Sequence, residues 1–250
     1  LAPTAIFGFA PNNVWIGGRG GEFWFYNGNS WTKKSVITIE GYDWISIENI
    51  WGDSPNNIYA VGFAENSETY QSVIAKFDGV QWQSLGTSQM RKSFIKIQRG
   101  TKTSNKFYIL GIGFEQFFDD TSYIYEFDGI KLSEIYKGLA NSSEIGGLEN
   151  INGEMYFLNG SKILKYVNNS FQLFLQINEP AAIWGRNSKD IFLGKIDGIA
   201  HYNGIDIEYL HNFNNPGIKI TDGVVFDKEI FVLAADYNSG LNFIYRGVLK

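Results

Sequence analysis

The chain has 250 residues and no cysteine, so structural disulfides, thiolate catalysis and cysteine-ligated metals are excluded. A formal net charge of −5 and the lack of any basic cluster disfavour binding to nucleic-acid phosphates. No apolar run reaches the roughly 18 residues of a membrane span. With 44% hydrophobic and 16% aromatic residues, the sequence predicts a large core in one domain covering residues 1–250.

Residues 5–36 are the first of six similar segments of short β-rich runs separated by turn residues. IFGFAPNNVWIGG holds two such runs around a Pro-Asn-Asn turn, and FYNGNSW holds two more around Asn-Gly. Residues 45–85 repeat this pattern with IWGDSPNNIYAVG and KFDGVQW. Further copies are predicted over residues 94–136, 144–177, 181–210 and 218–249. Four short strands joined by tight turns form one antiparallel sheet, so each copy is predicted to be one sheet.

Two columns of aromatic residues keep the six copies in register. The second strand of each copy carries Trp15, Tyr59, Tyr108, Tyr156, Phe192 or Phe231, and the third strand closes on Tyr26, Phe77, Phe127, Tyr166, Tyr202 or Tyr245. A regular repeat of four-stranded sheets is typical of a β-propeller, in which large aromatic side chains fill the space between sheets. We therefore predict an all-β fold, a single β-propeller with six blades, with seven blades as the alternative.

The last copy ends at its third predicted strand, and only residues 1–4 precede the first strand of the first copy. Propellers usually close by sharing one blade between the two chain ends. We expect a three-stranded sixth blade, an outer strand supplied by residues before Leu1, or a further blade outside this sequence. A first residue other than Met is also what a mature or trimmed exported protein shows.

Three of the copies carry a resemblance to known repeats. The segments APNNVWIGG, GDSPNNIYAVG and AIWGRNSKDIFLG, with the Asn-Gly or Asp-Gly turns that follow them, resemble the propeller repeats of uncharacterised exported Bacteroidota-type proteins. They are more distantly similar to the propeller repeats of two-component sensor ectodomains. The resemblance implies the fold and an exported bacterial setting, whether periplasmic, at the cell surface or secreted. It implies no catalytic residues.

The residues offer little conventional chemistry. The two histidines, His201 and His211, lack a carboxylate cluster at metal-ligand spacing, and no phosphate loop, nucleophile elbow or dinucleotide motif is present. Gly17–Gly21 joins two strands, so we interpret it as a tight turn. No metal or cofactor is predicted. A pair of carboxylates for glycoside hydrolysis stays open, because such groups need only be close in space.

The candidates for that pair lie at the ends of first strands, at the mouth of the axial channel of a propeller. They are Asp53 and Glu149, with Arg99 and Arg186 as possible ion-pair partners. Ordinary channel-mouth charges are the competing interpretation.

The connections between second and third strands distinguish the copies. Residues 63–72 and 114–122 read as long insertions in neighbouring copies, and insertions on one face of a repeat protein often mark its binding face. The predicted partner surface combines aromatic residues with an acidic rim: Trp44, Tyr70, Phe117 and Phe118 with Glu65, Glu68, Asp119 and Asp120. We predict a non-enzymatic binding or scaffold propeller that mediates protein–protein interaction. A glycan-binding lectin and a carbohydrate-active hydrolase acting at the channel mouth are the alternatives.

Overall fold

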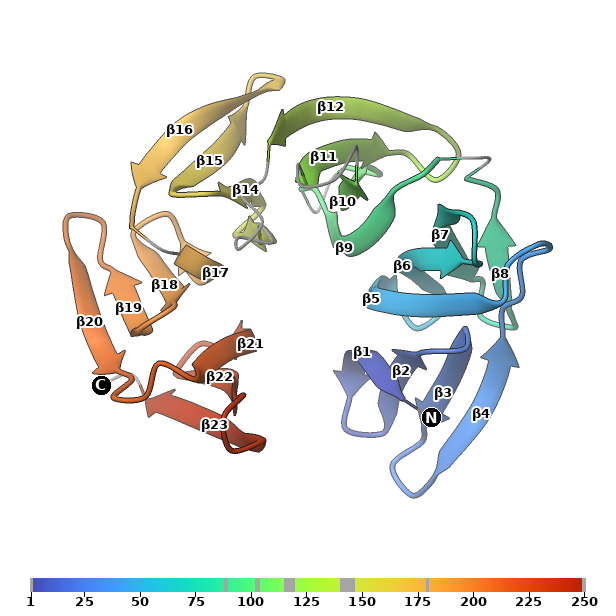
Figure 1. Cartoon of the computed structure of the whole chain (residues 1–250), viewed down its shortest axis with the longest axis horizontal. Coiled ribbons are helices and arrows are strands. Elements are labelled where there is room, and N and C mark those ends of the chain that lie inside the picture. The colour runs from blue at the N-terminus through green and yellow to red at the C-terminus, as the bar shows by residue number, and fades with distance from the viewer. Residues whose placement is uncertain are drawn as a thin grey trace. The chain divides into compact units, whose positions relative to one another are not determined.

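The computed structural model describes residues 2–87, 90–101, 104–114, 120–139, 147–178 and 180–248. These residues form strands and turns without any helix. The strands build five four-stranded sheets and one three-stranded sheet, the six blades of a β-propeller (Figure 1). The predicted fold class and the predicted number of blades are confirmed.

Blades 1 to 3 belong to one compact unit, unit 1, which comprises Leu1–Arg99 and Thr103–Leu139. Blade 1 contains β1 (Pro3–Ala10), β2 (Asn13–Gly18), β3 (Glu22–Tyr26) and β4 (Trp31–Val36). Blade 2 contains β5 (Trp44–Ser54), β6 (Asn57–Glu65), β7 (Tyr70–Phe77) and β8 (Trp82–Leu85). Blade 3 contains β9 (Ser93–Arg99), β10 (Phe107–Phe114), β11 (Asp120–Phe127) and β12 (Leu132–Leu139).

Blades 4 to 6 belong to unit 2, which comprises Gly100–Lys102 and Ala140–Lys250. Blade 4 contains β13 (Leu148–Ile151), β14 (Glu154–Asn159), β15 (Lys162–Val167) and β16 (Ser170–Gln176). Blade 5 contains β17 (Pro180–Asn187), β18 (Asp190–Lys195), β19 (Gly198–Tyr202) and β20 (Ile207–Asn212). Blade 6 contains β21 (Ile218–Val225), β22 (Glu229–Asp236) and β23 (Leu241–Val248), so its described residues form three strands.

The turn between the third and fourth strands is built in the same way in four blades. In blade 2, the Asp78 carboxylate accepts hydrogen bonds from the backbone N–H groups of Val80 (2.8 Å) and Gln81 (3.0 Å). Gly79 between them has a φ of +98°, which glycine adopts without a steric cost. Asn27, Asp128 and Asn203 accept the equivalent pairs of bonds in blades 1, 3 and 5. These Asx turns explain why Asn-Gly and Asp-Gly recur at this point of the sequence.

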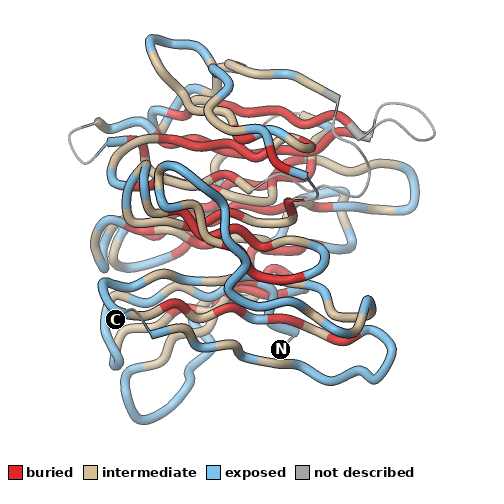
Figure 2. Tube along the Cα trace, turned by 90° about the vertical axis from the view of Figure 1, so that its left-hand side faces the viewer, coloured by how far each residue is buried: buried red, intermediate tan, exposed pale blue. Residues whose placement is uncertain are grey.

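Aromatic side chains fill the space between blades in unit 1, as the columns predicted. Trp15 of blade 1 lies 4.7 Å from Phe77 of blade 2 between ring centroids, and Phe23 stacks on Trp82 at 3.8 Å. Tyr59 of blade 2 lies 4.6 Å from Phe107 of blade 3. Figure 2 shows buried segments along the strands and exposed segments in the connecting loops. Burying such rings stabilises the stack by about 2 kcal/mol or more each.

In unit 2, blades 5 and 6 pack in the same way. Trp184 and Phe192 of blade 5 are buried in one cluster with Ile230 and Val232 of blade 6. The second-strand aromatic therefore faces the following blade in both units.

Two boundaries differ from the sequence prediction. The insertion expected over residues 63–72 is mostly strand, because β6 continues to Glu65 and β7 begins at Tyr70. Ala64 and Ser72 are both fully buried, so this part of the ladder is held in the core despite its polar sequence. His211, which lies just after the fifth predicted copy (residues 181–210) and was therefore expected in a connection, pairs with Ile199 within β20. The ladder between β19 and β20 reaches Asn212, two residues beyond the predicted end of this copy.

Candidate binding surface

Three of the predicted site residues lie side by side at one end of blade 2. Trp44 is paired with Glu65 across β5 and β6, and Glu65 is paired with Tyr70 across β6 and β7. Residues directly opposite each other on antiparallel strands project from the same face of the sheet. Trp44 keeps 40% of its surface exposed, Glu65 is exposed, and Tyr70 is partly buried. We call these three residues the Trp44 row.

The glycine-rich connection of blade 1 supports the row from one side. The N–H groups of Gly20 and Gly21 both donate to the carbonyl of Ile45, at 2.7 and 3.2 Å. This pairing brings the Arg19 guanidinium to 5.9 Å from the centroid of the Trp44 ring, within the range of a cation–π contact. Gly20 and Gly21 have positive φ values, as expected of the tight turn that the sequence predicted here.

A well-bonded turn holds the other side of the row. Asn66 accepts hydrogen bonds from the N–H groups of Glu68 (2.9 Å) and Thr69 (2.8 Å), and its amide donates to the carbonyl of Gly41 at 2.7 Å. The N–H of Asp43 donates to the carbonyl of Glu65 at 3.1 Å. Glu68 is exposed in this turn. The row and Glu68 are therefore presented by ordered backbone and not by a long loop.

The blade 3 part of the predicted surface is not described to the same extent. Phe117, Phe118 and Asp119 lie outside the described residues. Asp120 begins β11 and pairs with Phe114, and its side chain is also outside the description. The structure thus brings together Trp44, Glu65 and Tyr70 with Glu68 nearby.

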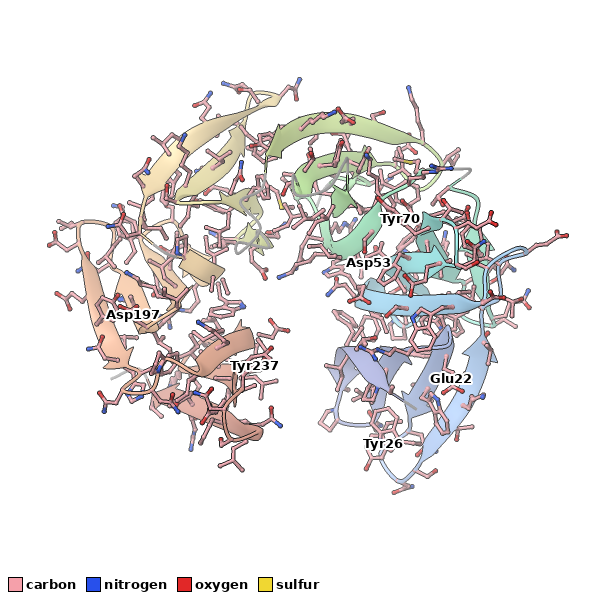
Figure 3. All side chains as sticks on the ribbon, in the orientation of Figure 1. Glu22, Tyr26, Asp53, Tyr70, Asp197 and Tyr237 are labelled. Atoms are coloured by element: carbon pink, nitrogen blue, oxygen red, sulfur yellow. The ribbon has the colours of Figure 1, made fainter. Side chains whose placement is uncertain are left out.

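Asp53, predicted at the channel mouth, has its hydrogen-bond and ion-pair partners within unit 1. Figure 3 labels it in blade 2. Its carboxylate accepts hydrogen bonds from the Arg99 guanidinium of blade 3 and from the Asn57 amide, both at 2.9 Å. Arg99 also donates to the carbonyl of Ser104 at 3.1 Å. The sequence analysis named an ion pair with Arg99 as the alternative to a catalytic role for Asp53. This ion pair links blade 2 to blade 3.

Glu149 occupies a different position in the repeat. It lies within β13 opposite Tyr156, where blade 2 has Trp51 opposite Tyr59. Asp53 instead lies two residues beyond Trp51, next to Ser54 at the end of β5. The two carboxylates are therefore not at corresponding ends of first strands, and they belong to different units.

The fourth predicted residue of this group, Arg186, lies in a cluster that the sequence did not indicate. Its guanidinium donates to the Asp190 carboxylate and to the carbonyl of Asp227 in blade 6. The other oxygen of Asp190 lies 2.7 Å from His201 Nε2. Burial raises the pKa of Asp190, but the bonds from Arg186 and His201 outweigh it and hold that pKa below its ordinary value. The sequence analysis named His201 but not its partner Asp190, because the two residues meet only across the strand pair β18–β19.

A repeat signal for this cluster does exist in the sequence. Residues 52–57 of blade 2 (GDSPNN) align with residues 185–190 of blade 5 (GRNSKD), so Asp53 and Arg186 occupy the same position of the repeat. Each interacts with the residue four places later and with the next blade. In blades 2 and 5, this position therefore carries a polar link to the following blade.

Within the part of the chain that the structure describes, no three His, Cys, Asp or Glu side chains are grouped closely enough to hold a metal ion. No helix of the described residues has the length and apolar character needed to cross a membrane.

No protein-family model and no curated protein matches the chain. Solved structures do match. The extracellular domain of a hybrid two-component system from B. thetaiotaomicron has a TM-score of 0.60 and 12% identity, over 98% of this chain and 34% of that chain. Regucalcin from Agrobacterium tumefaciens, a calcium-binding protein, has a TM-score of 0.62 and 10% identity, over 99% of this chain and 91% of that chain. A glucose dehydrogenase has a TM-score of 0.60 and 10% identity, over 99% of this chain and 96% of that chain.

These similarities confirm the expected likeness to a sensor ectodomain at the level of fold. The chain spans about a third of the length of that sensor chain. At such identities the likeness shows the propeller fold alone, and the three proteins differ in their named roles. The function must therefore be argued from the side chains.

Proposed function

We propose that this chain is a non-enzymatic binding module that presents the Trp44 row to a protein partner. The observation that carries the proposal is the placement of an exposed tryptophan, an exposed glutamate and a tyrosine in one row on rigid strands. Tryptophan and tyrosine are the residues that most often anchor protein interfaces, and a central anchor can contribute about 2 kcal/mol or more to binding. A preorganised surface also loses little conformational entropy when it binds.

The charges around the row indicate the chemistry of the partner. Glu65 lies opposite Trp44 and Glu68 is exposed in the turn that follows Glu65, so these two carboxylates outweigh the single charge of Arg19 at the Trp44 ring. The chain as a whole carries a net charge of −5. A partner segment with a basic side chain next to an apolar one would complement this surface. Since the charges are exposed, we expect binding to weaken as the salt concentration rises.

The setting we propose for this interaction is outside the bacterial cytoplasm. Support comes from the likeness of the repeats to those of exported proteins and from the extracellular domain among the similar structures. Fusion to a reporter that is active only after export, made with the natural full-length gene, tests this setting. Activity confined to the cytoplasm would contradict it.

Site-specific photocrosslinking tests the partner site directly. A photoreactive phenylalanine analogue at position 44 is expected to crosslink one protein in the source organism. Trp31 is the matched control position, because its exposed fraction of 42% is close to the 40% of Trp44 and it lies outside the row. With the crosslinked protein purified, Trp44→Ala is expected to weaken its affinity about tenfold or more. Equal crosslinking from both positions, or unchanged affinity, would remove the row as the partner site.

The hydrolase alternative is tested at Asp53. A carbohydrate-active enzyme using this carboxylate would cleave at least one member of a glycoside panel and lose that activity in Asp53→Asn. We expect no cleavage by either protein, because Asp53 is engaged by Arg99 and Asn57. Cleavage that is abolished by the substitution would replace the binding-module proposal.

A further inference from the structure

Among the described residues, β23 is the outer edge of blade 6, and it differs from the outer strands of the other blades. It has eight residues and pairs with β22 without a register shift. The outer strands of blades 1, 3, 4 and 5 are bulged against their neighbours, and that of blade 2 has only four residues. Bulges and short strands keep an edge from pairing with another chain. Since β23 has neither, it is the outer strand best suited to such pairing.

A cavity of about 230 Å³ adjoins this edge, between blades 5 and 6 of unit 2. Its walls are Ile199, Leu210 and His211 of blade 5 with Ile230, Val232 and residues 245–247 of blade 6. Ile199, Ile230 and Val232 also belong to the buried cluster that joins these two blades. The cavity therefore continues the interface between blades 5 and 6 outward to β23.

Blade 2 shows which side chains occupy this place when a fourth strand is present. Phe77 of the third strand lies opposite Trp82, which begins the fourth. Trp82 stacks on Phe23 of blade 1 at 3.8 Å between ring centroids. The corresponding pairs of the other four-stranded blades are Tyr26–Trp31, Phe127–Leu132, Tyr166–Phe171 and Tyr202–Ile207. Two large side chains at the junction of the third and fourth strands are thus common to all five of these blades.

In blade 6, the described residues supply neither side chain of this pair. The pairing registers place Gly247 at the position of Phe77, two residues beyond the Tyr245 that the sequence had aligned there. They also place Ile199 of the cavity wall at the position of Phe23. The cavity therefore lies where the first side chain of a fourth strand would sit, opposite Gly247 and against Ile199.

We propose that the edge of β23 binds an extended peptide segment of a partner protein, which pairs antiparallel with β23 and places a large apolar side chain opposite Gly247 in the cavity. In complexes of this kind, backbone hydrogen bonds to the open edge provide affinity and a side-chain pocket provides specificity. An aromatic residue on the neighbouring strand also compensates for a glycine at an edge. The site lies in unit 2, whereas the Trp44 row lies in unit 1, so the inference does not depend on the proposed function.

The charge on β23 adds to the chemistry of the segment. Arg246 is the single charged residue of this strand, and it keeps 59% of its side chain exposed beside Glu229. The residue after the apolar one would lie opposite Arg246, as Glu208 lies opposite His201 in blade 5. A large apolar residue followed by an acidic one is therefore the expected motif.

A single extended segment suits this edge better than a second copy of the chain. Leu210 and His211 show that β20 already lies across the cavity from β23. Pairing two copies of β23 would bring two β20 strands over the same face of the joined sheet.

Fluorescence anisotropy with a labelled peptide tests the inference. The probe is VQWESLG, which copies residues 80–86 around the fourth strand of blade 2 with glutamate after the tryptophan. It is titrated with the full chain, and we expect saturable binding. Replacing the tryptophan of the peptide with alanine, in VQAESLG, is expected to weaken binding about tenfold or more.

A variant of the chain locates the bound peptide. Leu210→Ser removes apolar contact from the cavity wall and is expected to weaken binding about fivefold. Leu173→Ser is the matched control, because Leu173 also lies in an outer strand of unit 2, is 59% exposed against 54% for Leu210, and lies outside the cavity. It should bind as the wild type does, and a thermal melt confirms that both variants fold.

Five results would overturn the inference. Three are no saturable binding of VQWESLG, equal binding of VQWESLG and VQAESLG, and equal binding by the two variants. A fourth is a dimer in sedimentation velocity that VQWESLG dissociates, since a second copy would then fill the edge. The fifth is a natural full-length protein that does not bind a peptide that this chain binds, since a segment of its own chain would then occupy the site.

Discussion

Replacing Asp190 with Asn tests how much the Arg186–Asp190–His201 cluster stabilises unit 2. The side chains of Arg186, Asp190 and His201 keep 30%, 14% and 23% of their surface exposed. Exposed ion pairs contribute about 0–1 kcal/mol, whereas breaking a fully buried pair costs about 3–5 kcal/mol. Because the cluster lies between these limits, we expect Asp190→Asn to lower the free energy of unfolding by about 2 kcal/mol at pH 7.

Urea unfolding of the wild type, Asp190→Asn, Arg186→Gln and the double variant measures this contribution. A double-mutant cycle should give a coupling energy of about 1 kcal/mol or more between Arg186 and Asp190. Asp206→Asn is the control in the same blade, since Asp206 is exposed in the β19–β20 turn. A loss no larger than that of the control would refute the assignment of a stabilising ion pair.

The pH dependence gives a second check with a definite sign. The pKa of Asp190 is lower in the folded chain than its ordinary value, so the folded state favours the charged carboxylate. Its contribution is then complete above the ordinary value of about 4 and is lost as the pH falls through the lowered pKa. The stability difference between the wild type and Asp190→Asn should therefore close at acid pH. A difference that persists unchanged at strongly acid pH would contradict this explanation.

Two further predictions concern the packing of blade 1 on blade 2. Gly17→Ala should lower the free energy of unfolding by about 1–3 kcal/mol in a calorimetric melt, because an added Cβ would lie 2.5 Å from Ile47 Cγ2. Gly86→Ala is the control, since no atom lies within 4 Å of its added Cβ. Equal stability of the two variants would show that the Ile47 side chain moves aside without cost. The free energy of unfolding of Trp82→Phe, measured in urea, should stay within about 1 kcal/mol of the wild-type value, because removing an unpaired buried donor offsets the loss of ring size. A loss above about 2 kcal/mol would indicate that the indole N–H is bonded in the folded chain.

The fold was predictable because its signals are local and repeated. Asp78-Gly79 and its counterparts specify a turn by their own side-chain bonds and positive φ, without help from distant residues. The second-strand aromatics, such as Trp15 and Tyr59, are buried by the next blade in a way that any propeller requires. Each copy repeats the same local information, so the six copies support one another.

The site was less predictable because it depends on neighbours across strands and blades. Glu65 and Tyr70 read as loop residues, yet buried Ala64 and Ser72 beside them keep this polar segment in the sheet. The bond between Asp190 and His201 depends on the register of two strands. The unpaired atom of Trp82 is visible only when its surroundings are known. Such features arise from tertiary packing, which alternation of polar and apolar residues does not encode.

One position of the repeat, at the end of the first strand, makes contacts that run forward along the chain to the following blade in blades 1, 2 and 5. Phe9 reaches forward to the backbone beside Gly52, Asp53 to Arg99, and Arg186 to the carbonyl of Asp227. Asp53 precedes its partner by 46 residues and Arg186 precedes its partner by 41, about one blade in each case. During synthesis on the ribosome, a blade would therefore leave the exit tunnel before the residue that makes this contact, which belongs to the following blade. At about 5–20 residues per second, that interval lasts a few seconds, during which the newest blade exposes the face that its successor will cover.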